Sequence, residues 1–101
     1  GRLVQMSFTE FQSSLQESTV PQGLGSPLQG LWHDGKGEWE KAHRRVQDDA
    51  STEAAWVHAY LHRKEGDASN AAYWYARARR PEPKTTLEEE WADIARELLE
   101  V

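Results

Sequence analysis

Hydrophobic residues recur along the chain at intervals of three and four, which is the spacing of one face of an α-helix. Short polar stretches that contain glycine, proline, serine or aspartate separate these amphipathic segments. No run of β-branched residues alternates with polar ones, as the sequence of a half-buried strand would. The pattern therefore predicts an all-α fold of about six short helices.

Capping boxes mark the starts of the first and the last predicted helix. Ser7 is followed three residues later by Glu10, and Thr86 is followed in the same way by Glu89. At this spacing the hydroxyl and the carboxylate each accept a hydrogen bond from the other residue's backbone N–H. The starts of the helices between them are expected near Ser26, Glu38, Thr52 and just after Asp67.

An internal repeat relates the middle of the chain to itself at an offset of 29 residues. The segment 37–42 aligns with the segment 66–71, and each begins with glycine and ends with alanine. Glycine permits the left-handed backbone that ends a helix, and the small alanine lets the next helix approach closely. Each unit is therefore predicted to be a helix, a glycine turn and a second helix, and His33 stands opposite His62.

This repeat resembles the tetratricopeptide repeat and the related Sel1-type repeat. The second unit is the better match, because its small, turn and aromatic residues stand at the family's spacings. These residues are Ala59, Gly66, Ala71, Tyr75, Ala78 and Pro83. The first unit keeps Gly30, Gly37 and Ala42, but Val46 and Asp49 stand where the second unit has an aromatic and a small residue.

The resemblance covers about residues 26–83 and implies two antiparallel helical hairpins. A free-standing array needs about three repeats or more, so we expect the first and last helices to act as caps. The segment 56–75 is also similar to small bacterial proteins of unknown function. We expect residues 7–101 to form a single helical-repeat domain, and residues 1–6 to be an added remnant or a disordered start.

A binding groove follows from the resemblance, since the first helix of each hairpin lines a concave surface in that family. Carried over to the better-matched unit, the groove consists of Trp56, Tyr60, Arg63 and Lys64. Aromatic side chains with a cationic rim suit a protein segment, especially one that carries a carboxylate. The alternative is that the terminal helices cover this surface and make it part of the core.

Histidines form a second candidate site. His58 and His62 are four residues apart on one predicted helix, so their rings share a face, and this spacing suits a pair of zinc ligands. Glu65 is close in sequence, and His33 is the repeat equivalent of His62. These four residues predict a ligand or metal cluster between the hairpins. The alternative is that the histidines are buried and hydrogen-bond to neighbouring helices.

Composition excludes several classes of function. The 101 residues include no cysteine, so disulfides, thiolate metal sites and cysteine nucleophiles are excluded. A net charge of −5 disfavours nucleic-acid binding, which needs clustered basic residues. No apolar run approaches the ~20 residues of a membrane span. No phosphate-binding loop, nucleophile elbow or dinucleotide motif is present, so we expect no catalytic residue and no cofactor.

These features favour a non-catalytic interaction or assembly module that binds a protein segment or its own copy. The rival hypothesis is a protein that binds a small ligand or a metal, enzymatic or not, through the histidine cluster. A third is a purely structural subunit of a larger assembly. We expect a cytoplasmic location, because the absence of cysteine fits a reducing compartment.

Overall fold

Helices make up all of the regular structure in residues 6–99, which are the residues that the computed structural model describes. Six of them are α-helices and one is a short 3-10 helix, and no strand occurs within that range. The predicted all-α fold is therefore confirmed. The elements are α1 (Phe8–Ser13), η1 (Ser14–Gln16), α2 (Ser26–Gly35), α3 (Trp39–Val46), α4 (Thr52–Glu65), α5 (Ala68–Ala78) and α6 (Leu87–Leu99).

Both predicted capping boxes are present. The Ser7 backbone N–H donates to the Glu10 carboxylate over 2.8 Å, and the Glu10 N–H donates to the Ser7 hydroxyl over 3.1 Å. Thr86 and Glu89 make the same reciprocal pair over 2.9 and 3.1 Å. Helix α2 begins at Ser26, as predicted, and its N-cap residue is Gly25, which has no side chain to make a capping hydrogen bond.

Small residues allow the helices to pack in sequential pairs, α2 with α3 and α4 with α5. A methyl group at Gly30 would lie only 2.8 Å from the Val46 side chain and 3.2 Å from the Ala42 carbonyl oxygen, so α2 and α3 approach closely there. The turns between paired helices contain Gly37 and Gly66, whose φ angles of 80° and 89° are the left-handed values that favour glycine. The resemblance to tetratricopeptide repeats remains a prediction.

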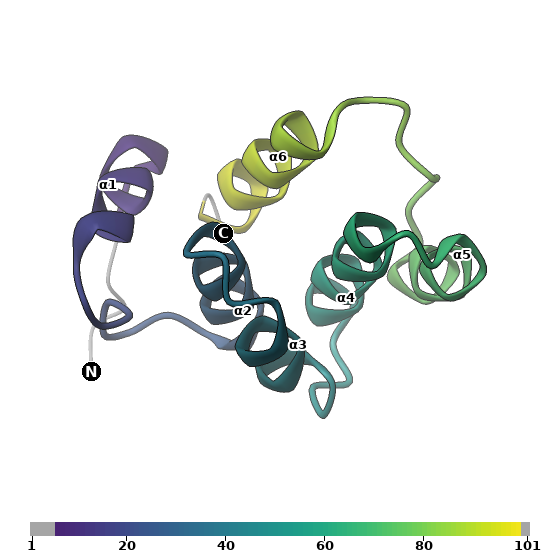
Figure 1. Ribbon diagram of the computed structural model, residues 1–101, viewed down its shortest axis with the longest axis horizontal. Coiled ribbons are helices and arrows are strands. Elements are labelled where there is room, and N and C mark those ends of the chain that lie inside the picture. The colour runs from purple at the N-terminus through teal and green to yellow at the C-terminus, as the bar shows by residue number, and fades with distance from the viewer. Residues whose placement is uncertain (1–5, 100–101) are drawn as a thin grey trace.

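Helix α4 is the centre of the molecule. It packs against α2, α3, α5 and α6, and every residue from 54 to 62 along it is buried. Figure 1 shows α6 lying across α2 and α4, with α1 on the far side of α2. A helix that is covered on all sides must place any polar side chain inside the protein. Helix α4 carries two such side chains, His58 and His62.

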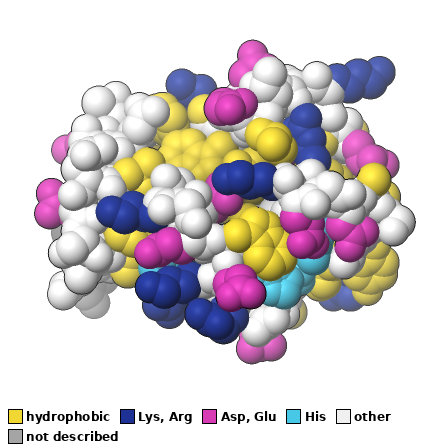
Figure 2. Space-filling view, viewed as in Figure 1, with side chains coloured by type: hydrophobic (Ala, Val, Ile, Leu, Met, Phe, Trp, Pro, Cys, Tyr) yellow, Lys and Arg dark blue, Asp and Glu magenta, His cyan; other side chains and the backbone are white. Residues whose placement is uncertain are grey.

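Three further features concern the surface of the molecule, the character of its helices and the start of the chain. Histidine side chains reach one face of the molecule, close to a group of Lys and Arg side chains (Figure 2). None of the described helices combines the length and the apolar character that crossing a bilayer requires. Most of the predicted remnant, residues 1–5, lies outside the described residues, whereas Met6 packs against the core.

Candidate functional site

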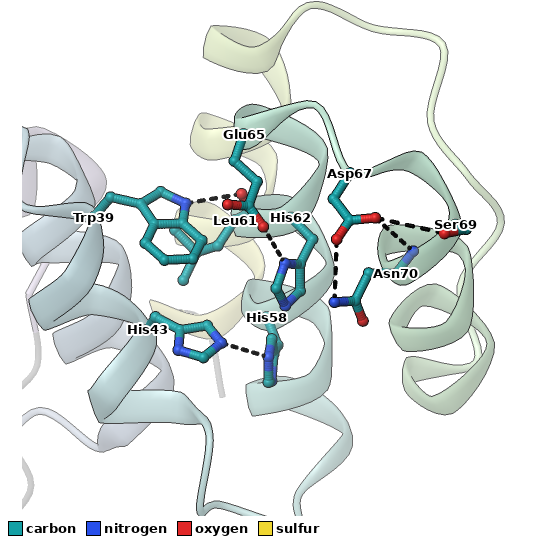
Figure 3. A network of polar contacts seen from close by, with 9 residues as sticks. All are labelled: Trp39, His43, His58, Leu61, His62, Glu65, Asp67, Ser69 and Asn70. Carbon is teal, nitrogen blue, oxygen red and sulfur yellow. Dashed lines mark hydrogen bonds and ion pairs between the residues drawn. The ribbon is translucent and has the colours of Figure 1, made fainter.

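Three histidines from two helices meet between the two helix pairs. His58 and His62 lie one turn apart on α4, and His43 reaches them from α3. The Nε2 atoms of His43 and His58 are 3.0 Å apart. Each of the three rings offers a nitrogen that lies within 4.8 Å of the nitrogens of the other two. Figure 3 shows the ring of His62 turned toward the same point. We call these three residues the histidine cluster.

Tryptophan rings form the walls of the histidine cluster. Trp39 stacks on His43 with a centroid distance of 5.0 Å, and the edge of its ring lies against His62. Trp39 is itself held by a hydrogen bond of 2.9 Å from its Nε1–H to the Leu61 carbonyl oxygen of α4. Trp74 of α5 stacks on His58 at 3.9 Å. These contacts fix the ring planes and shield the rings from water.

Glu65 fixes the orientation of His62. Its carboxylate lies 2.7 Å from Nδ1 of His62, so Nδ1–H donates to it and Nε2 is left facing the cluster. Asp67 also lies near His62 and Glu65. However, the Asp67 carboxylate accepts the backbone N–H of Asn70 over 3.3 Å, because it caps the start of α5. Glu65 is therefore the carboxylate that binds a histidine of the cluster, whereas Asp67 caps helix α5.

Burial disfavours the charged forms of His43 and His58. Desolvation, with a smaller contribution from the neighbouring His43 and His62 rings, lowers the pKa of His58 to about 4. Desolvation also lowers the pKa of His43, and His62 adds to this effect. The Nδ1 atom of His58 is buried and has no hydrogen-bond partner within residues 6–99. At neutral pH these two rings therefore carry lone pairs rather than a positive charge.

Acid should destabilise the metal-free protein through His58. A pKa near 4 in the folded state, against about 6.5 when unfolded, means that the unfolded chain gains the proton first as the pH falls. The groups that face His58 are His43, His62 and, through His62, Glu65. The free energy of unfolding should fall by roughly 2 kcal/mol between about pH 6.5 and pH 4 from this residue.

Urea unfolding curves at a series of pH values, in the presence of a chelator, measure this effect. The matched control is His58→Gln, which cannot take up a proton and should show a smaller loss over the same pH range. Equal losses in the two proteins would show that His58 is not the group responsible.

Of the four residues in the predicted cluster, the structure brings His58, His62 and Glu65 together, whereas His33 lies elsewhere. The Nδ1 of His33 lies 2.9 Å from the Glu38 carboxylate at the turn between α2 and α3, and the ring takes no part in the cluster. His43 occupies the position in the cluster that we had assigned to His33. The one signal for His43 in the sequence is its helical spacing from Trp39 and Val46, which puts the three residues on one face of a helix.

The predicted groove is covered. Tyr60 is 2 % exposed and Trp56 is 8 % exposed, because α6 packs along this side of α4. The Arg63 guanidinium donates to Glu90 of α6 over 2.7 Å, and Lys64 pairs with the buried Asp34 over 2.9 Å. These four residues thus make contacts within the protein, which is the alternative that the sequence left open.

A hollow remains beside α6. It has a volume of about 340 Å³ and lies between α1, α2, α4 and α6. Tyr60 and Lys64 contribute to its wall together with Phe8, Leu15 and Trp91. The Tyr60 hydroxyl and the Lys64 ammonium group both bond to the same carboxylate, that of Asp34. Their polar atoms are therefore already satisfied within the protein.

Comparisons of the chain with models of protein families, with curated proteins and with solved structures found no significant match.

Proposed function

We propose that this protein binds a divalent transition-metal ion, with Zn²⁺ the best match, through His43, His58 and His62. The observation that carries the proposal is the convergence of three imidazole nitrogens, all within 4.8 Å of one another, between α3 and α4. Imidazole is a preferred ligand of zinc, copper and nickel. Three protein ligands leave a fourth position for water or another small ligand.

The distances are close to those of a tetrahedral zinc site. With Zn–N bonds of roughly 2.0–2.1 Å, ligand nitrogens lie about 3.3 Å apart. The 3.0 Å between His43 and His58 is already near this value. No pair of these nitrogens is more than 4.8 Å apart, so side-chain rotations that shorten the distances to the His62 nitrogen by at most about 1.5 Å would complete the set.

The surroundings of the rings favour a metal over a proton. A metal binds the deprotonated imidazole, and burial lowers the pKa values of His43 and His58. The carboxylate of Glu65 on Nδ1 of His62 is the outer partner that metal-bound histidines commonly have. It holds the tautomer in which Nε2 of His62 carries the lone pair.

A bound metal would link the two helix pairs, because α3 belongs to the first pair and α4 to the second. Such a link stabilises the folded state directly. The proposal is metal binding, and no residue is assigned a catalytic role. Binding of a protein segment or of a second copy remains a prediction, and the surface that suggested it is covered by α6.

Calorimetric titration of the chelator-treated protein with Zn²⁺ tests the proposal. We expect one ion per chain in the wild type and a loss of affinity of at least tenfold in His43→Ala, because one of three ligands is gone. His43 is only half-buried, so its removal should leave the fold intact. The matched control is His33→Ala, which removes a histidine outside the cluster and should bind Zn²⁺ as the wild type does. Equal affinities of the wild type and His43→Ala would refute this ligand set.

A further inference from the structure

A second histidine–carboxylate pair, outside the histidine cluster, joins α2 to the turn that follows it. His33 is 8 % exposed, and its Nδ1 is 2.9 Å from the Glu38 carboxylate. That hydrogen bond is the main reason why the pKa of Glu38 lies below its ordinary value, so Glu38 is ionised at neutral pH and accepts the Nδ1–H. The Nε2 atom of His33 is buried and has no hydrogen-bond partner within residues 6–99. Buried ring nitrogens are rarely left without a partner.

His33 lines a hollow of about 320 Å³ whose other lining residues are all basic: Lys41, Arg44 and Arg45. We call it the basic hollow. Lys41 contacts Glu38 at 3.7 Å, whereas neither arginine is in an ion pair with any described residue. Both arginines are exposed on α3. Figure 2 shows Lys and Arg side chains gathered on the face of the molecule where α3 lies.

We propose that the basic hollow binds the phosphate group of a small molecule, in the form of a terminal phosphate dianion. This site is separate from the histidine cluster, and it does not depend on metal binding. Its ligand is defined by charge and by shape: a compact group with two negative charges and several acceptor oxygens.

The residue types in the basic hollow suit a phosphate group. Arginine presents a planar fork of N–H donors that matches phosphate oxygens, and lysine adds a flexible point charge. With Nδ1 of His33 committed to Glu38, Nε2 is the unpaired nitrogen of the histidine that lines the hollow.

The overall charge of the chain is negative, so it opposes anion binding outside a local basic site. At a net charge of −5 the protein repels anions at long range, so non-specific attraction cannot concentrate phosphate on it. Three basic side chains around one hollow are a local exception to that charge. Phosphate binding should therefore be confined to this hollow.

NMR titration with inorganic phosphate and with glycerol phosphate, in low salt and with chelator present, tests the proposal. Both probes should shift the signals of His33, Arg44 and Arg45. Arg44→Gln and Arg45→Gln should each weaken binding by about tenfold, the effect expected for one lost charge-assisted hydrogen bond. Both residues are exposed, so both variants should fold. The matched control is Lys84→Gln, which removes one exposed positive charge outside the hollow and should leave the affinity within about twofold.

The two probes distinguish the possible sources of the phosphate group. Tighter binding of glycerol phosphate would indicate an organic phosphate ester, and tighter binding of the inorganic ion would indicate free phosphate; either result supports the site. The proposal is overturned if neither probe binds. It is equally overturned if Lys84→Gln weakens binding as much as Arg44→Gln, or if only a single-stranded oligonucleotide binds.

Discussion

Zinc should raise the free energy of unfolding by about 2.7 kcal/mol when the free ion is present at about 100 times its Kd. The reason is that the three nitrogens meet only in the folded state: His43 lies on α3, whereas His58 and His62 lie on α4. In a domain of this size, that gain corresponds to a rise in melting temperature of roughly 10–20 °C. Thermal melts followed by circular dichroism, with chelator and with Zn²⁺, measure it.

The rise with zinc should vanish in His62→Ala, which removes a ligand but leaves His43 and His58 in place. The quantity to compare is the difference between melts with and without zinc, since His62→Ala also loses the hydrogen bond to Glu65 and starts from a lower stability. His33→Ala again provides the control and should retain the full rise. A zinc effect of the same size in His62→Ala would mean that the ion binds elsewhere.

Glu90→Ala should cost about 3–5 kcal/mol of folding free energy, a large part of the total of roughly 5–15 kcal/mol for a natural domain. Glu90 is 2 % exposed, and it accepts hydrogen bonds from Arg63 over 2.7 Å and from the Tyr75 hydroxyl over 2.6 Å. Burial raises the pKa of Tyr75, so its hydroxyl keeps its proton and donates. Removing the carboxylate leaves both donors without their partner under α6.

Urea unfolding at neutral pH measures this loss. Glu88→Ala is the matched control, because Glu88 is exposed two residues earlier on α6, and the loss there should stay below about 1 kcal/mol. Tyr75→Phe removes one of the two donors to Glu90. Its loss of folding free energy should lie between those of Glu90→Ala and Glu88→Ala, at about 1–3 kcal/mol. If Glu90→Ala proved no worse than Glu88→Ala, the contact between α6 and α4 would not depend on this network.

The positions of the helices could be predicted because the signals that start and end them are local. The reciprocal bonds of Ser7 with Glu10 and of Thr86 with Glu89 join residues three apart, so a short stretch of sequence contains the whole motif. The turn at Gly66 is equally local, since its left-handed backbone is a property of one residue. Two of the three members of the histidine cluster could be placed together for the same reason, because His58 and His62 share a face of a single helix.

The partner of that pair could not be predicted in the same way. The repeat offset pointed to His33, but the cluster is completed by His43, which depends on how α3 packs against α4. His33 instead faces its own turn, where Glu38 binds it. The pairing of a residue with one on another helix depends on the distance and angle between the helices, and an alignment of the two units contains neither.

The sequence by itself determined that this protein is all-α, where its helices begin, and which residues share a helical face. Tertiary structure alone decided that Tyr60 is core rather than groove and that His43 joins His58 and His62. The physical reason is that helix formation depends on contacts three and four residues apart, whereas burial depends on segments far apart in the chain. An aromatic on a helical face must be covered, but the sequence does not say whether α6 or another chain covers it.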